Sequence, residues 1–331
     1  MLRKRKKRVP LRPETTFLMS ALTAVFAIET YPSVYRLVEE VATIVGPERL
    51  ADADGLLCDT RFRVDEAVLA QAPKLRVIAN STVGYENIDV AACARRGIPF
   101  SNVRGSLNEA VADLSFALIL SSLRKIPTAV QWARSGRWMS EPAPYGNDLE
   151  GKTLGIAGFG EIGVAVARRA QASRMHVIYA NRHPREDDAV TGAAFTPLAS
   201  LLERADCVLA LVPLSAATRH MFGAAEFARM KPSAHFVNVG RGALVQTEAL
   251  LHALQSGQLA GAALDVTDPE PLPPEHPLFT LPNVTIVPHI GSATPETRER
   301  MALLAGRNLV AGLRGQPLPT RVPVETGTVS R

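Results

Sequence analysis

A glycine-rich turn between an apolar run and a helical pattern constrains the fold of this chain most strongly. Residues 158–163 have the sequence Gly-Phe-Gly-Glu-Ile-Gly, after the apolar run 152–158 and at the start of the helical pattern 160–173. The first glycine permits a tight turn, the second admits a phosphate, and the third lets helix and strand pack closely. Free N–H groups at the helix start would face the phosphates. The pattern therefore predicts a dinucleotide site at Gly158, Gly160, Glu161, Ile162 and Gly163, although a tight turn without a ligand is the alternative.

Short apolar runs alternate with helical patterns along most of the chain. The expected strands are 23–29, 55–59, 75–80, 98–102, 152–158, 176–181, 207–213, 235–240, 261–266 and 283–289. The expected helices are 32–44, 64–71, 87–95, 160–173, 197–205, 296–315, and a pair within 107–136 that is broken near Pro127. This alternation predicts an α/β fold with parallel strands and covering helices. A length of 331 residues suits two domains of about 100–200 residues each.

The composition excludes several classes of protein. Aromatic residues make up only 5% of the chain, so no surface for stacking nucleic-acid bases is expected. The cysteines at 58, 93 and 207 lack metal-ligand spacing, which predicts reduced thiols, no metal site and a cytoplasmic location. No apolar run is long enough to span a membrane.

The net charge of +5 is concentrated at the N-terminus, where six of the first eight residues are Lys or Arg. We expect residues 1–20 to be a basic, disordered tail in front of the first strand. A signal peptide, a true chain start at Met19, and a basic nucleic-acid or localisation patch are the alternatives.

The end of the strand 176–181 bears on the choice of dinucleotide. An acidic residue at this position would bind the free ribose 2′-hydroxyl of NAD. The sequence has Asn181 there, followed by Arg182 and, nearby, Arg185. A guanidinium can hold a 2′-phosphate, which a carboxylate would repel. The pattern therefore favours NADP(H), with NAD(H) still possible, unless these arginines are ordinary surface charges.

Three residues that follow expected strands make a catalytic constellation. They are Arg241 in Asn-Val-Gly-Arg-Gly, Glu270 in Asp-Pro-Glu-Pro, and His289 in Pro-His-Ile-Gly. Ligands of doubly wound sheets bind at the carboxyl ends of strands. Reduction of a 2-oxo acid requires a cation for the carboxylate and carbonyl oxygens, a proton donor, and a group that orients that donor, and Arg, His and Glu supply these. Each residue alone could be structural, and it is their combination with the glycine-rich turn that favours catalysis.

The motifs together resemble the D-isomer-specific 2-hydroxyacid dehydrogenase family, and within it the glyoxylate/hydroxypyruvate reductases. The matching segments are 83–89, 151–163, 212–218, 238–245, 262–273 and 288–294. The resemblance implies two doubly wound, Rossmann-like domains with the active site in the cleft between them. Residues 108–288 would form the dinucleotide-binding domain, and 21–107 with 289–331 the substrate-binding domain. It also implies a homodimer formed through the helices of 107–136.

The resemblance further implies the roles of individual residues. Arg241, Glu270 and His289 would be catalytic, and Asp265 would lie near the nicotinamide. The substrate would be bound by Val83, Gly84, Arg241 and Ser292. The cofactor site would also include Asn181, Arg182, Val212, Pro213, Thr218, Val239, Arg241, His289 and Gly291.

The expected reaction is hydride transfer from the cofactor to a small 2-oxo acid, with His289 as the proton donor. Formate dehydrogenases resemble this family but have Gln where Glu270 stands, which argues against that activity. A phosphoglycerate dehydrogenase-like role is a second alternative within the enzymes. A nucleotide-sensing corepressor or scaffold on the same fold, with little turnover, is the alternative from another class.

Overall fold

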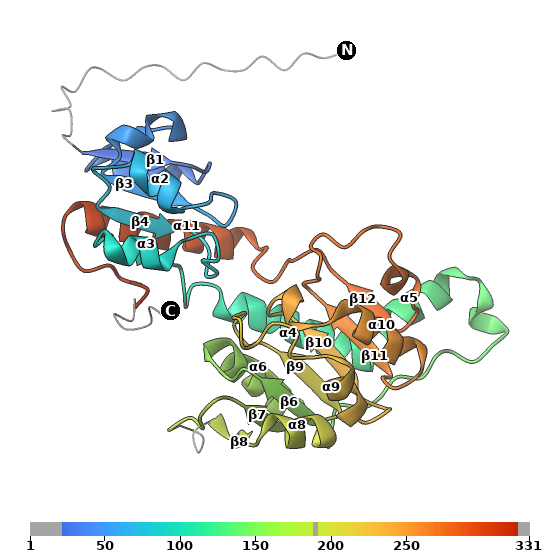
Figure 1. Ribbon diagram of the computed structural model, residues 1–331. Coiled ribbons are helices and arrows are strands. Elements are labelled where there is room, and N and C mark those ends of the chain that lie inside the picture. Colours follow the sequence, from blue (N-terminus) through green and yellow to red (C-terminus); the bar gives the residue numbers. More distant parts are fainter. Residues whose placement is uncertain (1–21, 188–190, 324–331) are drawn as a thin grey trace, which may run out of the picture. The chain divides into compact units, whose positions relative to one another are not determined.

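The computed structural model describes residues 22–187 and 191–323, so the expected tail, residues 1–20, lies outside the described residues. The chain forms two compact units (Figure 1). The first contains the residues up to Arg104 together with those from Glu299 onward, and the second contains Gly105–Arg298. The sequence placed the second boundary at 288/289. It falls ten residues later because the backbone at 289–291 is hydrogen-bonded to Asp265 of the second unit.

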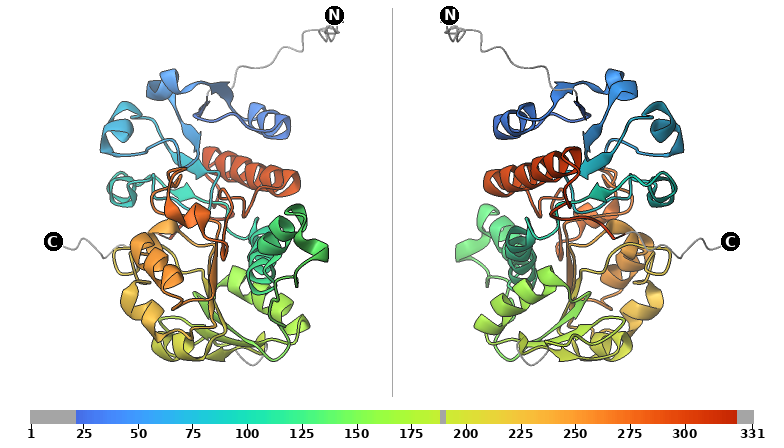
Figure 2. Two further views of the ribbon diagram at one scale, coloured as in Figure 1. Left: turned by 90° about the vertical axis from the view of Figure 1, so that its right-hand side faces the viewer. Right: turned by 90° about the vertical axis from the view of Figure 1, so that its left-hand side faces the viewer.

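The first unit is built on a parallel sheet of five strands in the order β2-β1-β3-β4-β5. The strands are β1 (Thr23–Phe26), β2 (Thr43–Val45), β3 (Gly55–Cys58), β4 (Val77–Asn80) and β5 (Phe100–Ser101). Its helices are α1 (Pro32–Glu39), α2 (Glu66–Gln71), α3 (Val90–Arg95) and the larger part of α11 (Pro295–Leu313), with a 3₁₀ helix at Pro47–Asp52. Helices α1 and α11 cover one face of the sheet, and α2 and α3 cover the other (Figure 2). Strands β3 and β4 are buried along their whole length, as parallel strands covered on both faces must be.

One expectation for this unit is wrong. The helix expected over 32–44 ends at Glu39, and residues Thr43–Val45 form the edge strand β2. These three residues are all β-branched, and they pair in parallel with β1. The apolar residues at helical spacing extend to Val41, but pairing with β1 outweighs that pattern.

The second unit is built on a parallel sheet of seven strands in the order β12-β11-β10-β9-β6-β7-β8. The strands are β6 (Thr153–Ala157), β7 (His176–Ala180), β8 (Ala194–Phe195), β9 (Cys207–Ala210), β10 (His235–Asn238), β11 (Gly261–Leu264) and β12 (Val284–Ile286). The chain starts in the middle at β6, winds outward to β8, and returns to β9 on the other side. This is the order of a Rossmann fold, and the reversal between β6 and β9 is the point where such sheets bind ligands.

Helices cover both faces of this sheet as well. They are α4 (Asn108–Leu123), α5 (Ile126–Arg134), α6 (Glu161–Ala172), α8 (Leu198–Arg204), α9 (Ala224–Arg229) and α10 (Thr247–Gln255). Short 3₁₀ helices occupy Arg137–Met139, Gly242–Leu244 and Pro277–Thr280. Helices α4 and α6 lie on one face, and α8, α9 and α10 lie on the other (Figure 2). Two parallel-sheet α/β units confirm the expected fold class.

Several local features of the second unit differ from the sequence-based expectations. The helix pair within 107–136 breaks at Lys125, whose left-handed φ of 53° ends α4, whereas Pro127 lies inside the first turn of α5. Strand β8 and helices α9 and α10 were not expected at all. The strand has two residues, too few for a periodic pattern to emerge.

No helix within the described ranges has the length and apolar character that crossing a membrane requires.

Candidate active site

The glycine-rich turn joins β6 to α6 as expected, and its first glycine is required by sterics. Gly158 has a φ of +93°, and a Cβ atom there would lie 2.5 Å from the backbone nitrogen of Val212. A Cβ on Gly160 would meet nothing within 4 Å, so this position opens on free space at the start of α6. Gly163 lies one turn into the helix, where a Cβ would be 3.0 Å from the Phe159 ring. The turn thus has open space beside helical N–H groups that have no partner among the described residues, which is the arrangement that suits a phosphate.

Asn181 holds the glycine-rich turn in place. Its Oδ1 accepts a hydrogen bond from the backbone N–H of Phe159 at 2.7 Å, and its Nδ2 donates to the Phe159 carbonyl at 3.2 Å. Arg185 donates to the same carbonyl at 3.3 Å. The residue after β7 therefore shapes the turn through a two-way amide contact, a role that the sequence analysis did not identify.

The two arginines after Asn181 differ in their surroundings. Arg185 is paired with Asp187, with Nε 2.6 Å from Oδ1 and Nη2 2.8 Å from Oδ2. Arg182 is exposed and has no hydrogen-bond or ion-pair partner among the described residues. Arg182 therefore carries the guanidinium that is available to an anionic ligand.

Two neighbouring strands bring further candidate residues to the same edge of the sheet. Val212 and Pro213 follow β9, and the Thr218 hydroxyl donates to the Pro213 carbonyl at 2.7 Å, which closes that loop. Val239 follows β10 and is buried. Near the start of α6, the Glu161 carboxylate accepts a hydrogen bond from Asn108 at 2.7 Å.

The turn that carries Arg241 is set by a buried asparagine and a glycine. The Asn238 side chain accepts from the Gly240 N–H at 3.1 Å and donates to the Arg241 carbonyl at 2.9 Å. A Cβ atom on Gly242 would lie 1.8 Å from the carbonyl oxygen of Thr267, so only glycine fits there. This contact places the half-buried Arg241 next to the segment that leads to Glu270. An Asn at the end of a strand and two residues before a Gly is typical of such a turn, and this pattern could have identified Asn238.

The turn that carries His289 is fixed by Asp265. The Asp265 side chain is 2% exposed, and it accepts hydrogen bonds from the N–H groups of Ile290 at 2.7 Å and Gly291 at 3.0 Å. Burial raises the pKa of the Asp265 carboxyl, and these N–H groups and the nearby His289 partly offset that effect. His289 adopts a left-handed φ of 51°, and its N–H donates to the Asp265 carbonyl at 2.9 Å. Asp265 thus determines where the imidazole lies.

His289 and Glu270 form a direct pair. Nδ1 of His289 lies 2.6 Å from Oε1 of Glu270, and both side chains are close to half exposed. Since the carboxylate occupies Nδ1, Nε2 is the ring nitrogen left for a reactant. The pair borders a pocket of about 460 Å³, whose lining includes Asp265, Phe279 and Ile286. A carboxylate in this position orients the ring.

The remaining candidates lie at two other places. Ser292 is half-buried beside Gly291, and its carbonyl accepts a hydrogen bond from the N–H of Thr294. Val83 and Gly84 belong to the first unit, in the loop after β4. Their carbonyls accept hydrogen bonds from buried side chains, whereas their N–H groups donate to no group of the described residues.

Comparison with known proteins agrees with this geometry. The family model "D-isomer specific 2-hydroxyacid dehydrogenase, NAD binding domain" matches residues 116–291. A glyoxylate reductase of Thermococcus gammatolerans is 42% identical over 313 residues, which cover 92% of each chain. A glyoxylate/hydroxypyruvate reductase B of Citrobacter koseri is 44% identical over 273 residues, 81% of this chain and 84% of that one.

Solved structures are similar over nearly the whole chain. The NADPH-dependent glyoxylate/hydroxypyruvate reductase of Sinorhizobium meliloti, solved with NADP and malonate, has a TM-score of 0.82 and 35% identity, and the match covers 92% of this chain and 97% of that one. A glyoxylate reductase of Paecilomyes thermophila has a TM-score of 0.86 and 32% identity, with 92% and 99% covered.

Fold, site and relatives together define an oxidoreductase that acts on the CH–OH group and uses a nicotinamide cofactor. The chain belongs to the D-isomer specific 2-hydroxyacid dehydrogenase family, and its substrates are small 2-oxo and 2-hydroxy acids. The family and the reaction class expected from the sequence are confirmed. The comparisons do not favour the alternative of a sensor or scaffold with little turnover.

Proposed function

We propose that this enzyme uses NADPH to reduce glyoxylate or hydroxypyruvate to the corresponding 2-hydroxy acid. The observation that carries the proposal is the 2.6 Å contact between Glu270 and His289 beside the Arg241 turn. Relatives named as reductases of these two acids, more than 40% identical over most of the chain, support the substrate class. The second unit would bind the dinucleotide, and the first would contribute backbone N–H groups for the substrate carboxylate.

The residues of the second unit fit a nicotinamide dinucleotide. The open space at Gly160 and the first turn of α6 would receive the pyrophosphate, with Val212, Pro213, Thr218 and Val239 along the neighbouring strand ends. When bound, the nicotinamide supplies the hydride. Asp265 and Gly291 would lie beside the nicotinamide.

NADP(H) is preferred in this proposal because of the charge at the end of β7. No carboxylate stands at position 181 to repel a 2′-phosphate, and the Arg182 guanidinium is exposed and without a partner in the described part of the chain. The Sinorhizobium meliloti relative, described as NADPH-dependent, was solved with NADP.

The substrate would be held by its charged end. In the first unit, the N–H groups of Val83 and Gly84 are the proposed donors to the carboxylate. In the second unit, the guanidinium of Arg241 and Ser292 are the proposed substrate contacts. Arg241 would also polarise the carbonyl oxygen at C2, where negative charge develops as the hydride arrives.

His289 would complete the reaction as the proton donor. Its Nε2 would hold a proton and transfer it to the C2 oxygen as the new C–H bond forms, which leaves a hydroxyl group on the product and a neutral imidazole. Glu270 on Nδ1 would orient the ring so that Nε2 faces the C2 oxygen. Solvent would then return the proton.

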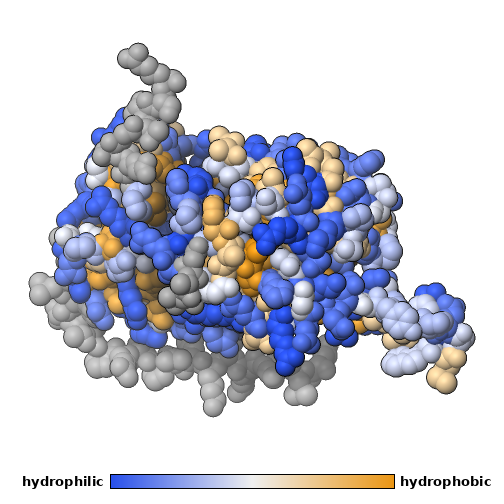
Figure 3. Space-filling model, turned by 90° about the horizontal axis from the view of Figure 1, so that it is seen from below, coloured by the Kyte–Doolittle hydropathy of each residue, from blue (hydrophilic) through white to orange (hydrophobic). Residues whose placement is uncertain are grey.

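We also propose a homodimer. Exposed apolar side chains gather on α5 and the segment that follows it, at Ile126, Val130, Trp138, Met139 and Tyr145. This segment extends away from the rest of the second unit (Figures 1 and 3). A second copy of the chain would cover this apolar surface, and sedimentation velocity of the purified protein would measure its mass directly.

The experiment that tests the function follows the absorbance of the reduced nicotinamide. Purified protein is mixed with NADPH or NADH and with glyoxylate, hydroxypyruvate, pyruvate or a bulkier 2-oxo acid. We expect rapid oxidation of NADPH with glyoxylate or hydroxypyruvate, and slower oxidation of NADH. Faster turnover of the bulkier acid would overturn the substrate assignment, and no turnover with any acid would overturn the reaction.

A further inference from the structure

The loop after β4 presents three successive carbonyl groups to buried side chains. The Asn80 Nδ2 donates to the Thr82 carbonyl at 3.2 Å and to the Gly84 carbonyl at 2.7 Å. The Asn102 Nδ2 donates to the Val83 carbonyl between them, at 2.9 Å. The Thr82 hydroxyl adds a second bond to the Gly84 carbonyl, at 2.8 Å. Every carbonyl of residues 82–84, called here loop 82–84, is thus bound.

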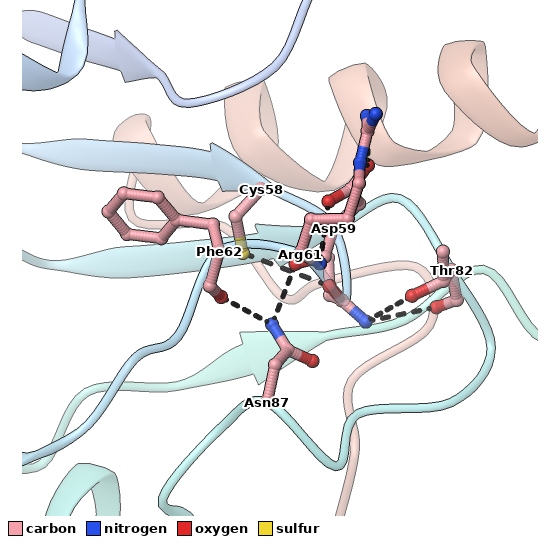
Figure 4. Close-up of polar contacts among 7 residues, drawn as sticks. Cys58, Asp59, Arg61, Phe62, Thr82 and Asn87 are labelled. Atoms are coloured by element: carbon pink, nitrogen blue, oxygen red, sulfur yellow. Dashed lines mark hydrogen bonds and ion pairs between the residues drawn. The ribbon is translucent and has the colours of Figure 1, made fainter. Parts of the chain in front are cut away.

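The orientation of the Asn80 amide is defined by its other partner. Asn80 is fully buried, and its Oδ1 faces the thiol of Cys58, with 3.8 Å between oxygen and sulfur. Burial, reinforced by the nearby Asp59 carboxylate, raises the pKa of the Cys58 thiol to about 12, so the sulfur keeps its proton and donates it. The amide nitrogen must therefore point toward the loop. Figure 4 shows Cys58 and Thr82 on opposite sides of these contacts.

The orientation of the Asn102 side chain is equally well defined. It is 6% exposed, and its Oδ1 accepts a hydrogen bond from the N–H of Arg104 at 3.3 Å. Its backbone carbonyl accepts from the Thr320 hydroxyl at 2.5 Å. Because both the side chain and the backbone of Asn102 are bound, its Nδ2 is fixed in the direction of Val83.

The segment that follows loop 82–84 is anchored by a third asparagine. The Asn87 Nδ2 donates to the carbonyls of Asp59 and Phe62, each at 2.9 Å (Figure 4). This contact ties the loop to the segment that follows β3. Loop 82–84 is therefore held by Asn80 and Asn102, and the segment that follows it is held by Asn87.

We infer that Asn80 and Asn102 are positioning residues for substrate recognition, which they achieve by binding the carbonyls of loop 82–84 and leaving the N–H groups of Val83 and Gly84 for the substrate carboxylate. Successive backbone N–H groups that face one way make an anion-binding concavity. Here the bound carbonyls prevent the peptide groups from turning over. This inference rests on the proposed function, because it assumes that the loop binds the carboxylate of a 2-oxo acid.

The test compares Asn80→Ala and Asn102→Ala with the unchanged enzyme. Each variant removes a side-chain donor from the carbonyls of the loop and lets the loop rotate, so we expect the KM for glyoxylate and the inhibition constant of malonate to rise about tenfold or more. The Kd of NADPH, measured by fluorescence titration without substrate, should change less than about twofold, since the cofactor does not need this loop. Unchanged glyoxylate and malonate constants in folded variants would overturn the inference.

Gln258→Ala is the matched control. The Gln258 Nε2 donates to the carbonyls of Phe227 and Met230, at 3.3 and 3.2 Å, so the variant also removes an amide that holds a backbone segment. We expect it to lower stability without changing the glyoxylate KM. An equal rise in KM in this variant would show that general loosening, and not loop geometry, causes the effect.

Amide hydrogen exchange in the unchanged protein gives an independent measurement if the alanine variants do not fold. The N–H groups of Val83 and Gly84 should exchange fast in the free protein and become protected when malonate is added to the complex with NADP. No protection at malonate concentrations that inhibit turnover would contradict the inference. Absence of turnover in the wild-type enzyme would instead refute the proposed function, so the two failures are distinguishable.

Discussion

Two loops in this protein expose backbone N–H groups after a parallel strand, and they are built in opposite ways. The turn 158–163 is shaped by missing side chains, since Gly158 has the backbone of Val212 against it and Gly160 faces open space. Loop 82–84 is shaped by side chains that are present, since Asn80 and Asn102 bind its carbonyls.

The difference follows from what comes next in the chain. Helix α6 begins at Glu161, directly after the glycine-rich turn, and the first N–H groups of a helix are free by geometry. After loop 82–84 the next helix, α3, begins only at Val90 and has six residues. Without a helix to orient its peptide groups, this loop needs buried donors on its carbonyl side. For backbone N–H groups to bind an anion, the carbonyl groups of the same segment must be fixed in the other direction. A helix or a pair of side-chain amides can fix them.

The largest effect on turnover is expected when the proton donor is removed, because neither loop can replace it. In His289→Ala, both loops remain intact, but no group replaces Nε2. We expect kcat to fall about 10³-fold, within the range for loss of a general acid, while the Kd of NADPH stays within about twofold. Steady-state kinetics and fluorescence titration measure the two quantities. A comparable loss of cofactor affinity would contradict the assigned role.

Two alanine variants of the glycine-rich turn separate its two physical requirements. Gly158→Ala places a Cβ atom 2.5 Å from the Val212 nitrogen at a positive φ, so we expect a loss of about 2–4 kcal/mol in the free energy of unfolding. Gly160→Ala meets open space and should leave stability within about 0.5 kcal/mol.

The cofactor distinguishes these variants further. In Gly160→Ala, the new methyl group would occupy the space proposed for the pyrophosphate, so we expect the Kd of NADPH to rise about 100-fold, a loss of about 2.7 kcal/mol. Denaturant unfolding and fluorescence titration give both numbers for each variant. Unimpaired NADPH binding by Gly160→Ala would place the cofactor elsewhere.

A smaller effect is expected for the charge beside the glycine-rich turn. Arg182→Ala removes the guanidinium proposed to bind the 2′-phosphate, so the KM of NADPH should rise about tenfold, as for loss of one charged hydrogen bond. The KM of NADH should be unchanged. Arg229→Ala is the control, because this exposed arginine pairs with Glu203 and does not contact the glycine-rich turn. If both cofactors respond equally to Arg182→Ala, this residue does not select between them.

The smallest effect on ligand binding is expected at the amino ends of the strands of the second sheet, away from the candidate site. His235, the first residue of β10, is 1% exposed, and its Nδ1 lies 2.7 Å from the Ser122 hydroxyl. Burial, with a contribution from Lys125, lowers the pKa of His235 to about 4. Between this value and the ordinary pKa of about 6.5, the unfolded chain binds a proton that the native protein does not, so stability is lost as the pH falls.

The corresponding variant is His235→Gln. A pKa difference of about 2.5 units corresponds to about 3 kcal/mol, so between pH 7 and pH 4 the variant should lose about 3 kcal/mol less stability than the wild type. Urea unfolding at several pH values measures this difference. NADPH and glyoxylate constants at pH 7 should not change. Parallel stability curves for the two proteins would show that His235 does not titrate in this window.

The two loops also differ in how far the sequence predicts them. The turn 158–163 is predicted residue by residue, because glycine spacing between a strand and a helix encodes its geometry locally. Loop 82–84 depends on Asn102, which lies about twenty residues away and reaches the loop only because β4 and β5 are neighbours in the sheet. A contact made through sheet pairing leaves no local pattern.

The same distinction applies to the rest of the site. Arg241, Glu270 and His289 are predictable because each residue type suits the chemistry and follows a strand. The contacts of Asn181 with Phe159 and of Asp265 with the turn at 289–291 depend on the distance between strand ends in the folded sheet. Edge strand β2 was missed for a related reason, since its pairing with β1 outweighs the helical spacing before it.

The most direct test of the proposed reaction traces the hydride. The enzyme is incubated with glyoxylate and NADPH that carries deuterium on both faces of the reactive nicotinamide carbon, and the product acid is analysed by mass spectrometry. We expect one deuterium on C2 of the 2-hydroxy acid for each NADPH oxidised. Tight binding of NADPH without formation of labelled 2-hydroxy acid would contradict it.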